Sequence, residues 1–151
     1  VGGHLQLTYC TVAQFYPFSA ERGAAITFGN TFNGLSLPQR GSLECLNTAI
    51  TGYAEDVVMG DTLSFDYKFI NSLLRTPAVD DSLRFQNVIF ESPKDSIQGE
   101  QHFRLVDISL QDYDFRLDSL STLRGKAMPV DGIYCNRNGA LRGDTLNIGC
   151  Y

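Results

Sequence analysis

Alternation of apolar and polar residues at every second position is the feature that most constrains this fold. It is clearest over residues 62–69, where Leu63, Phe65, Tyr67 and Phe69 fall on one face and polar residues on the other. A period of two is typical of a half-buried strand. Shorter runs of the same kind occur at residues 5–9, 25–28, 42–45, 83–85, 113–117 and 145–148. We therefore expect a chain built almost entirely of short strands.

Turn signals separate these runs at fairly regular intervals. Asn33-Gly34 and Asn138-Gly139 favour tight hairpins. The alternation loses phase at Leu105-Val106 and around Asn87-Val88, which indicates bulges. Many short strands with frequent turns predict an all-β fold, an antiparallel β-sandwich of the jelly-roll or immunoglobulin-like (Ig-like) kind. At most one or two short helices are expected, over residues 69–75 and 117–124.

Length and charge limit the domain count and the classes of partner. The 151 residues, 43% of them apolar, fit a single β domain over residues 1–151. The net charge of -5 and the absence of clustered Lys and Arg with interleaved aromatics argue against nucleic acid. The apolar runs are too short to insert into a membrane. The chain begins Val1-Gly2-Gly3-His4, a start that removal of a signal peptide or the choice of an expression boundary would give.

The cysteines indicate an oxidising compartment. Cys10, Cys45, Cys135 and Cys150 are an even number without C-x-x-C spacing, which favours disulfides over a zinc or redox site. Three pairings are open, and we favour Cys10 with Cys45 and Cys135 with Cys150, because the last two flank the Asn138-Gly139 signal. The expected location is secreted, extracellular or at the cell surface. The alternative is four buried free thiols in a cytosolic core.

The tripeptide Arg142-Gly143-Asp144 is a candidate adhesive loop. It is the tripeptide that integrin ligands display, and it lies between two cysteines that could staple a projecting loop. The alternative is ordinary turn chemistry, because Gly60-Asp61 also precedes an expected strand.

Three closely spaced carboxylates are weak candidates for a calcium site. Asp112, Asp114 and Asp118 supply the oxygen ligands that hard cations prefer, but the Gly and the distal Glu of a calcium loop are missing. No cofactor is therefore expected, with calcium as the alternative.

Sequence motifs of catalysis are absent. His4 and His102 are the only imidazoles, and there is no Gly-x-Ser-x-Gly elbow, phosphate loop or His-rich metal pattern. The chain is therefore expected not to be an enzyme. A hydrolase built from two carboxylates is the third choice, since such a pair needs only spatial proximity.

The leading functional hypothesis is a non-enzymatic extracellular or cell-surface structural or adhesive subunit. It would self-associate through β-strand edges into a homo-oligomer or fibre, with Leu5, Leu7 and Tyr9 as the candidate strand-exchange segment. The alternative is a small secreted binding module that recognises a glycan or a host surface protein. Its seven tyrosines could stack on sugar faces, although Trp is absent.

Overall fold

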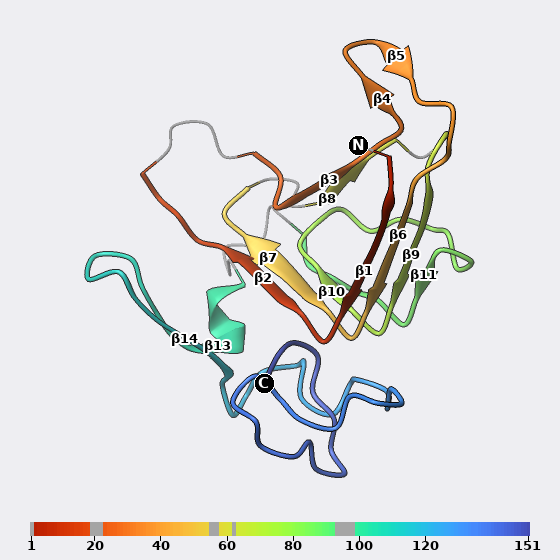
Figure 1. The fold of residues 1–151 in the computed structure, drawn as a ribbon. Coiled ribbons are helices and arrows are strands. Elements are labelled where there is room, and N and C mark those ends of the chain that lie inside the picture. The colour runs from red at the N-terminus through yellow and green to blue at the C-terminus, as the bar shows by residue number, and fades with distance from the viewer. Residues whose placement is uncertain (1, 19–22, 55–57, 62, 93–98) are drawn as a thin grey trace.

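The chain is all-β, and its main sheets are parallel. The computed structural model describes residues 2–18, 23–54, 58–61, 63–92 and 99–151. The first sheet contains, in spatial order, β1 (His4–Thr8), β6 (Ser42–Leu46), β9 (Asp66–Ile70) and β11 (Phe85–Gln86). The second contains β12 (Ile89–Phe90), β10 (Leu73–Leu74), β7 (Ala49–Gly52) and β2 (Thr11–Gln14), and a third pairs β3 (Ile26–Phe28) with β8 (Val58–Gly60). Every pairing within these three sheets is parallel (Figure 1).

The order of the strands shows that the chain winds into stacked coils. The first coil consists of β1, β2 and β3, the second of β6, β7 and β8, the third of β9 and β10, and the fourth of β11 and β12. Corresponding residues lie in register, so that His4 lies beside Ser42 and Ser42 beside Asp66. This arrangement is a parallel β-solenoid.

The expected antiparallel sandwich is therefore wrong. Alternation specifies which face of a strand is buried, but it does not specify whether its neighbour is the next strand in sequence or the equivalent strand of the next coil. Antiparallel ladders among the described residues are confined to β4 (Thr31–Phe32) with β5 (Leu35–Ser36), and to β13 (Phe103–Asp107) with β14 (Asp112–Leu117). The first of these hairpins turns at Asn33-Gly34, as the sequence predicts.

Left-handed residues form the corner between the first and second sheets in every coil. Tyr9, Asn47, Asn71 and Asn87 all have φ between 45° and 52°, and Asn is the side chain that best tolerates this region. The corners are linked across coils, since Cys10 N donates to Thr48 Oγ1 at 3.3 Å and Thr48 N to Ser72 Oγ at 3.1 Å. The phase slip at Asn87-Val88 is thus a corner rather than a bulge. The slip near Leu105 does coincide with a register shift, between Phe103 and Leu105.

Two hydrophobic cores lie on opposite faces of the second sheet. The inner core is enclosed by the coils and includes Leu43, Cys45, Ile50, Phe69 and Leu74. The outer core joins Ala49 and Leu73 to side chains from later in the chain, namely Phe103, Leu117, Leu123 and Ile148. The hairpin of β13 and β14 and the segment after it therefore cover the outside of the solenoid.

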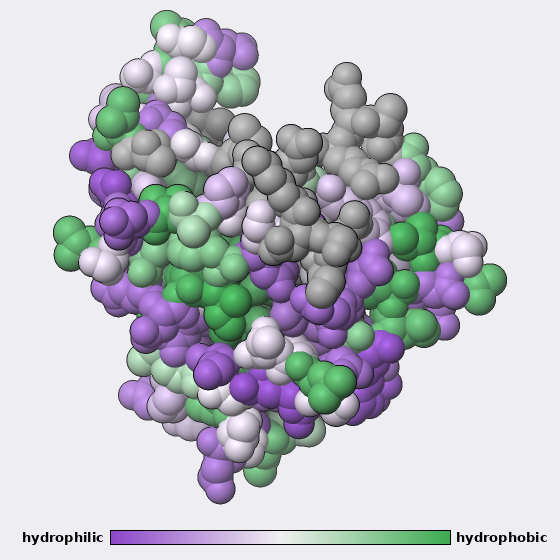
Figure 2. All heavy atoms as spheres, turned by 180° about the vertical axis from the view of Figure 1, so that it is seen from behind, coloured by the Kyte–Doolittle hydropathy of each residue, from purple (hydrophilic) through white to green (hydrophobic). Residues whose placement is uncertain are grey.

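Residues 118–151 contain no ladder strand or α-helix, and they run along the solenoid corner (Figure 1). Asn71 Nδ2 donates to Lys126 O at 3.2 Å and Asn47 Nδ2 to Met128 O at 2.7 Å, so this segment crosses successive coils. The strand expected at residues 145–148 and the helices expected at 69–75 and 117–124 are not formed. The described residues contain one short 3₁₀ helix, η1 (Glu100–His102), and no helix that could cross a membrane. The face in Figure 2 mixes hydrophobic and hydrophilic residues.

Candidate functional site

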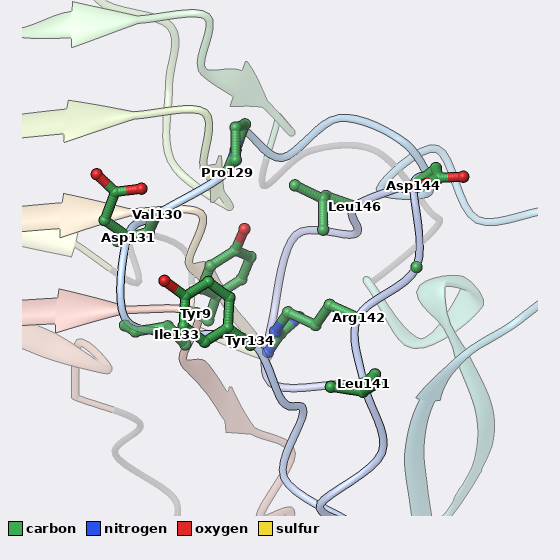
Figure 3. Close-up of a pocket in the computed structure, with 11 residues that line it drawn as sticks. Tyr9, Pro129, Val130, Asp131, Ile133, Tyr134, Leu141, Arg142, Asp144 and Leu146 are labelled. Atoms are coloured by element: carbon green, nitrogen blue, oxygen red, sulfur yellow. The ribbon is translucent and has the colours of Figure 1, made fainter.

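A pocket of about 560 Å³ lies between the first corner of the solenoid and the C-terminal loops (Figure 3). Its lining is mainly apolar and aromatic, with one cation and two carboxylates, and includes Tyr9, Asp131, Tyr134, Leu141, Arg142 and Asp144. Concave, mostly apolar sites with a few polar groups are the usual form of small-ligand sites. This pocket is therefore the candidate functional site.

The floor of the pocket is a cation stacked on an aromatic ring. Tyr9 is held by the corner geometry and by its hydroxyl, which donates to Met128 O at 2.6 Å. The Arg142 guanidinium carbon lies 3.8 Å from the centroid of the Tyr9 ring, an attractive cation–π distance. Arg142 also donates to Cys135 O at 3.3 Å and to Gly149 O at 3.4 Å. Burial raises the pKa of Tyr9 and lowers the pKa of Arg142.

The walls of the pocket expose apolar surface to solvent. Tyr134 is 66% exposed and Leu141 is 78% exposed, and both line the opening. Figure 3 shows Arg142 reaching toward the two tyrosines, whereas the Asp144 carboxylate points away from it. An exposed ring beside a fixed cation offers a stacking face and hydrogen-bond donors in one place.

The structure places the three residues of the predicted adhesive loop in different environments. Arg142 is packed on Tyr9 and bonded to two backbone carbonyls, whereas Gly143 and Asp144 are exposed. The tripeptide thus presents a carboxylate and contributes its guanidinium to the pocket. Integrin recognition stays a prediction.

The three candidate calcium ligands are not gathered around one point. Asp114 receives hydrogen bonds from Arg116 Nε at 2.8 and 2.9 Å, and this contact lowers the pKa of Asp114 to about 2. Asp118 Oδ1 accepts from Leu120 N at 2.8 Å, and Asp112 lies at the β14 start opposite Asp107. Among the residues that the structure describes, no three His, Cys, Asp or Glu side chains form a metal-binding group.

All four cysteines are free thiols in the structure. Cys45 lies in the inner core, where burial raises its pKa to about 12. Cys10 is half-buried at the first corner with its pKa also raised by burial, and Cys135 is exposed. Cys150 lies near the first coil, since its backbone N donates to Thr11 Oγ1 at 3.1 Å. The two disulfides stay predictions.

The candidate strand-exchange segment belongs to the solenoid's own first sheet. β1 pairs with β6 along its whole length, and Leu7 packs against the inner core. Leu5 is half exposed, and Tyr9 forms the corner and the pocket floor. Within the described part of the chain, no strand pairs with the other edge of β1.

A buried chain of polar side chains joins η1 to the second sheet. His102 Nε2 contacts Glu91 Oε1, and His102 Nδ1 lies 3.2 Å from Ser121 Oγ. The order serine, histidine, carboxylate is that of hydrolases, but His102 is only 1% exposed and Ser121 Oγ already accepts from Leu123 N at 3.4 Å. His102 and Ser121 are both buried, and the three residues fasten η1 to the sheet.

Sequence reasoning did not find the pocket. Its lining comes from the first corner and from loops more than a hundred positions later in the chain, and no local pattern joins the two. The sequence singles out Arg142 and Asp144 only as members of the Arg142-Gly143-Asp144 tripeptide. Comparison of the chain with protein-family models, with curated proteins and with solved structures finds no match.

Proposed function

We propose that this chain is a glycan-binding module of a secreted or cell-surface protein. The observation that carries the proposal is the pocket in which Arg142 is fixed on Tyr9 beside the exposed ring of Tyr134. A sugar ring has apolar C–H faces and a rim of hydroxyls, so it needs an aromatic platform with donors and acceptors beside it. Tyr134 offers the platform, and Arg142 with Asp131 offers the polar groups.

The pocket floor is rigid, which supports its use as a binding site. Tyr9 is 4% exposed and hydrogen bonded to Met128 O, and Arg142 donates to two carbonyls. Groups that are already fixed lose little conformational entropy when a ligand arrives. The parallel solenoid supplies this rigidity, because the Tyr9 corner is continuous with stacked strands.

Binding to an array of immobilised neutral and acidic oligosaccharides tests this proposal. We expect Tyr134→Ala to weaken binding at least tenfold, equivalent to about 1.4 kcal/mol, because the stacking face is removed. Tyr16→Ala is the matched control, since Tyr16 is equally exposed, at 62%, and does not line the pocket. Absence of binding to every glycan, or equal loss in both variants, would reject the proposal.

Self-association through strand edges is the second candidate, favoured by the outer edge of β1. β1 and β2 are the outermost strands of their sheets in the described residues, and an open parallel edge can accept another strand. Sedimentation velocity over a wide concentration range tests this: growing species support it, and a monomer at every concentration rejects it.

A further inference from the structure

A second, smaller pocket of about 160 Å³ is lined by three arginines. Arg104 lies on β13, Arg116 on β14 and Arg124 in the segment that follows. Asn136, Asn138, Asn147 and Tyr151 complete the polar lining, and no Asp or Glu side chain contributes to it. Guanidinium groups and amide nitrogens are all hydrogen-bond donors, so this pocket is suited to an anion.

Two of these arginines are available to a ligand. Arg116 is already paired with Asp114. Arg104 and Arg124 are exposed, and neither takes part in an ion pair among the described residues. The chain as a whole carries a net charge of -5, so two exposed arginines beside the Arg116–Asp114 pair are a local reversal of charge.

A third pocket of about 120 Å³ connects the arginines to the tyrosine site. It shares Leu141, Arg142, Gly143 and Leu146 with the tyrosine pocket. At its other side it shares Asn136, Asn147 and Tyr151 with the arginine pocket. Neighbouring pockets share lining residues, so the three lie in a row along the C-terminal loops, and we call this row the trough; aromatic surface lies at one end and cations at the other.

We propose that this trough binds an anionic polysaccharide, with one sugar stacked at Tyr134 and a carboxylate or sulfate group of a later sugar among Arg104, Arg116 and Arg124. The inference rests on the proposed glycan-binding function and names its ligand class. Nucleic acid fits less well, because it carries charge at every unit, whereas Asp131 and Asp144 line the tyrosine end. A glycan with spaced acid groups matches both ends.

The test compares acidic tetrasaccharides with their neutral counterparts by calorimetry. The probes are tetrasaccharides in which glucuronate or galacturonate alternates with a neutral sugar, and a galactan tetrasaccharide sulfated on alternate units, each paired with its carboxyl-reduced or desulfated form. We expect at least one acidic probe to bind about tenfold or more tightly than its neutral form. High salt should remove this preference, because exposed charges are screened. The double variant Arg104→Gln with Arg124→Gln should also remove it while leaving the neutral probe's affinity unchanged.

The controls separate this inference from the proposed function. Arg40→Gln removes an exposed arginine that pairs with Asp66 and does not line the trough. This variant should still bind the acidic probe more tightly than its neutral form. Equal affinity for acidic and neutral probes, with Tyr134→Ala weakening both, overturns the anionic inference and leaves glycan binding standing. Binding of no probe overturns both. Tighter binding of a single-stranded oligonucleotide than of any glycan also overturns the inference.

Discussion

Asn47 is the residue on which the solenoid and the C-terminal segment meet. It occupies the left-handed corner of the second coil at φ 52° and is fully buried. Its side chain accepts from Met128 N at 3.0 Å and donates to Met128 O at 2.7 Å, and its backbone O accepts from Gly149 N at 2.9 Å. One residue therefore satisfies the corner geometry and holds two distant stretches of chain.

Substitution of Asn47 separates these two roles. Asn47→Gly keeps the left-handed backbone and loses the two side-chain hydrogen bonds, which should lower the free energy of unfolding by about 2 kcal/mol. Asn47→Ala should cost about 1 kcal/mol more, because a Cβ is strained in this region. Asn87→Gly is the control at an exposed corner and should change stability little. Equal denaturant midpoints for the two Asn47 variants would contradict the strain argument.

The cysteines differ sharply in their expected reactivity. Burial raises the pKa of Cys45 to about 12, and the thiolate is the reactive form. Under native reducing conditions at mildly alkaline pH, iodoacetamide should label exposed Cys135 first and Cys45 only after unfolding. Because this pKa is raised, the neutral thiol's contribution to stability is present below the unfolded pKa and is lost as pH rises toward 12. Labelling of Cys45 as fast as Cys135, read by mass spectrometry, would contradict the buried position.

For single residues, the sequence predicts burial correctly within strands but less reliably in the residues next to them. Tyr67 and Phe69 are buried on one face of β9, as the alternation indicates. Leu63 has the same phase but is 90% exposed, because β9 begins only at Asp66. Asp61 Oδ1 accepts from Leu63 N at 3.0 Å and from Ser64 N at 3.2 Å, so a side-chain turn replaces the ladder there.

At the scale of elements, η1 is fastened to the second sheet by His102. This imidazole joins Glu91, which follows β12, to Ser121, which follows β14. Glu91 Oε2 is buried and has no hydrogen-bond partner among the described residues. The carboxylate therefore depends on His102 to offset its desolvation.

Removal of the imidazole should be costly. His102→Ala leaves Glu91 buried without this hydrogen-bond partner, and we expect a loss of about 1–3 kcal/mol in unfolding free energy. His4→Ala is the matched control, because His4 also contacts a serine hydroxyl, at 2.7 Å from Ser42 Oγ, but on the surface. Replacing Glu91 and His102 together by Leu should recover part of the loss, since neither buried side chain then needs a hydrogen-bond partner. Similar denaturant midpoints for His102→Ala and His4→Ala would show that the contact is not structural.

The alternation does not show which strands pair with one another, although the sequence contains a repeated corner motif. Asn47-Thr48-Ala49-Ile50, Asn71-Ser72-Leu73-Leu74 and Asn87-Val88-Ile89-Phe90 each place a corner before a strand of the second sheet. The coils differ in length, because the β4–β5 hairpin and other loops are inserted between strands. Since solenoids are recognised by a fixed period, this variation hides the repeat. The strands of the first sheet, β3 and β14 were predictable, but the strands of the second sheet and the partners of the strands were not.

At the scale of the whole molecule, the second sheet is shared by both cores. Adjacent residues of one strand point to opposite sides, so that Ile50 packs in the inner core and Ala49 in the outer core. The outer core is completed by Phe103, Leu123 and Ile148, which come from the hairpin and the C-terminal loops. The trough lies mainly on these loops. The site is therefore positioned by the solenoid through this outer core.

The shared sheet predicts that the solenoid and the C-terminal loops unfold together. Ile148 is fully buried in the outer core, and its N donates to Leu123 O at 3.1 Å. Ile148→Ala should lower the global unfolding free energy by about 2–5 kcal/mol. The unfolding midpoints followed by tyrosine fluorescence and by far-ultraviolet dichroism should shift by the same amount. Leu110→Ala, at a 76% exposed position in the β13–β14 turn, should change it by less than about 0.5 kcal/mol. An Ile148→Ala protein in which an early transition separates from an unchanged later one would instead show that the loops form an independent unit, and the trough would then lack a rigid support.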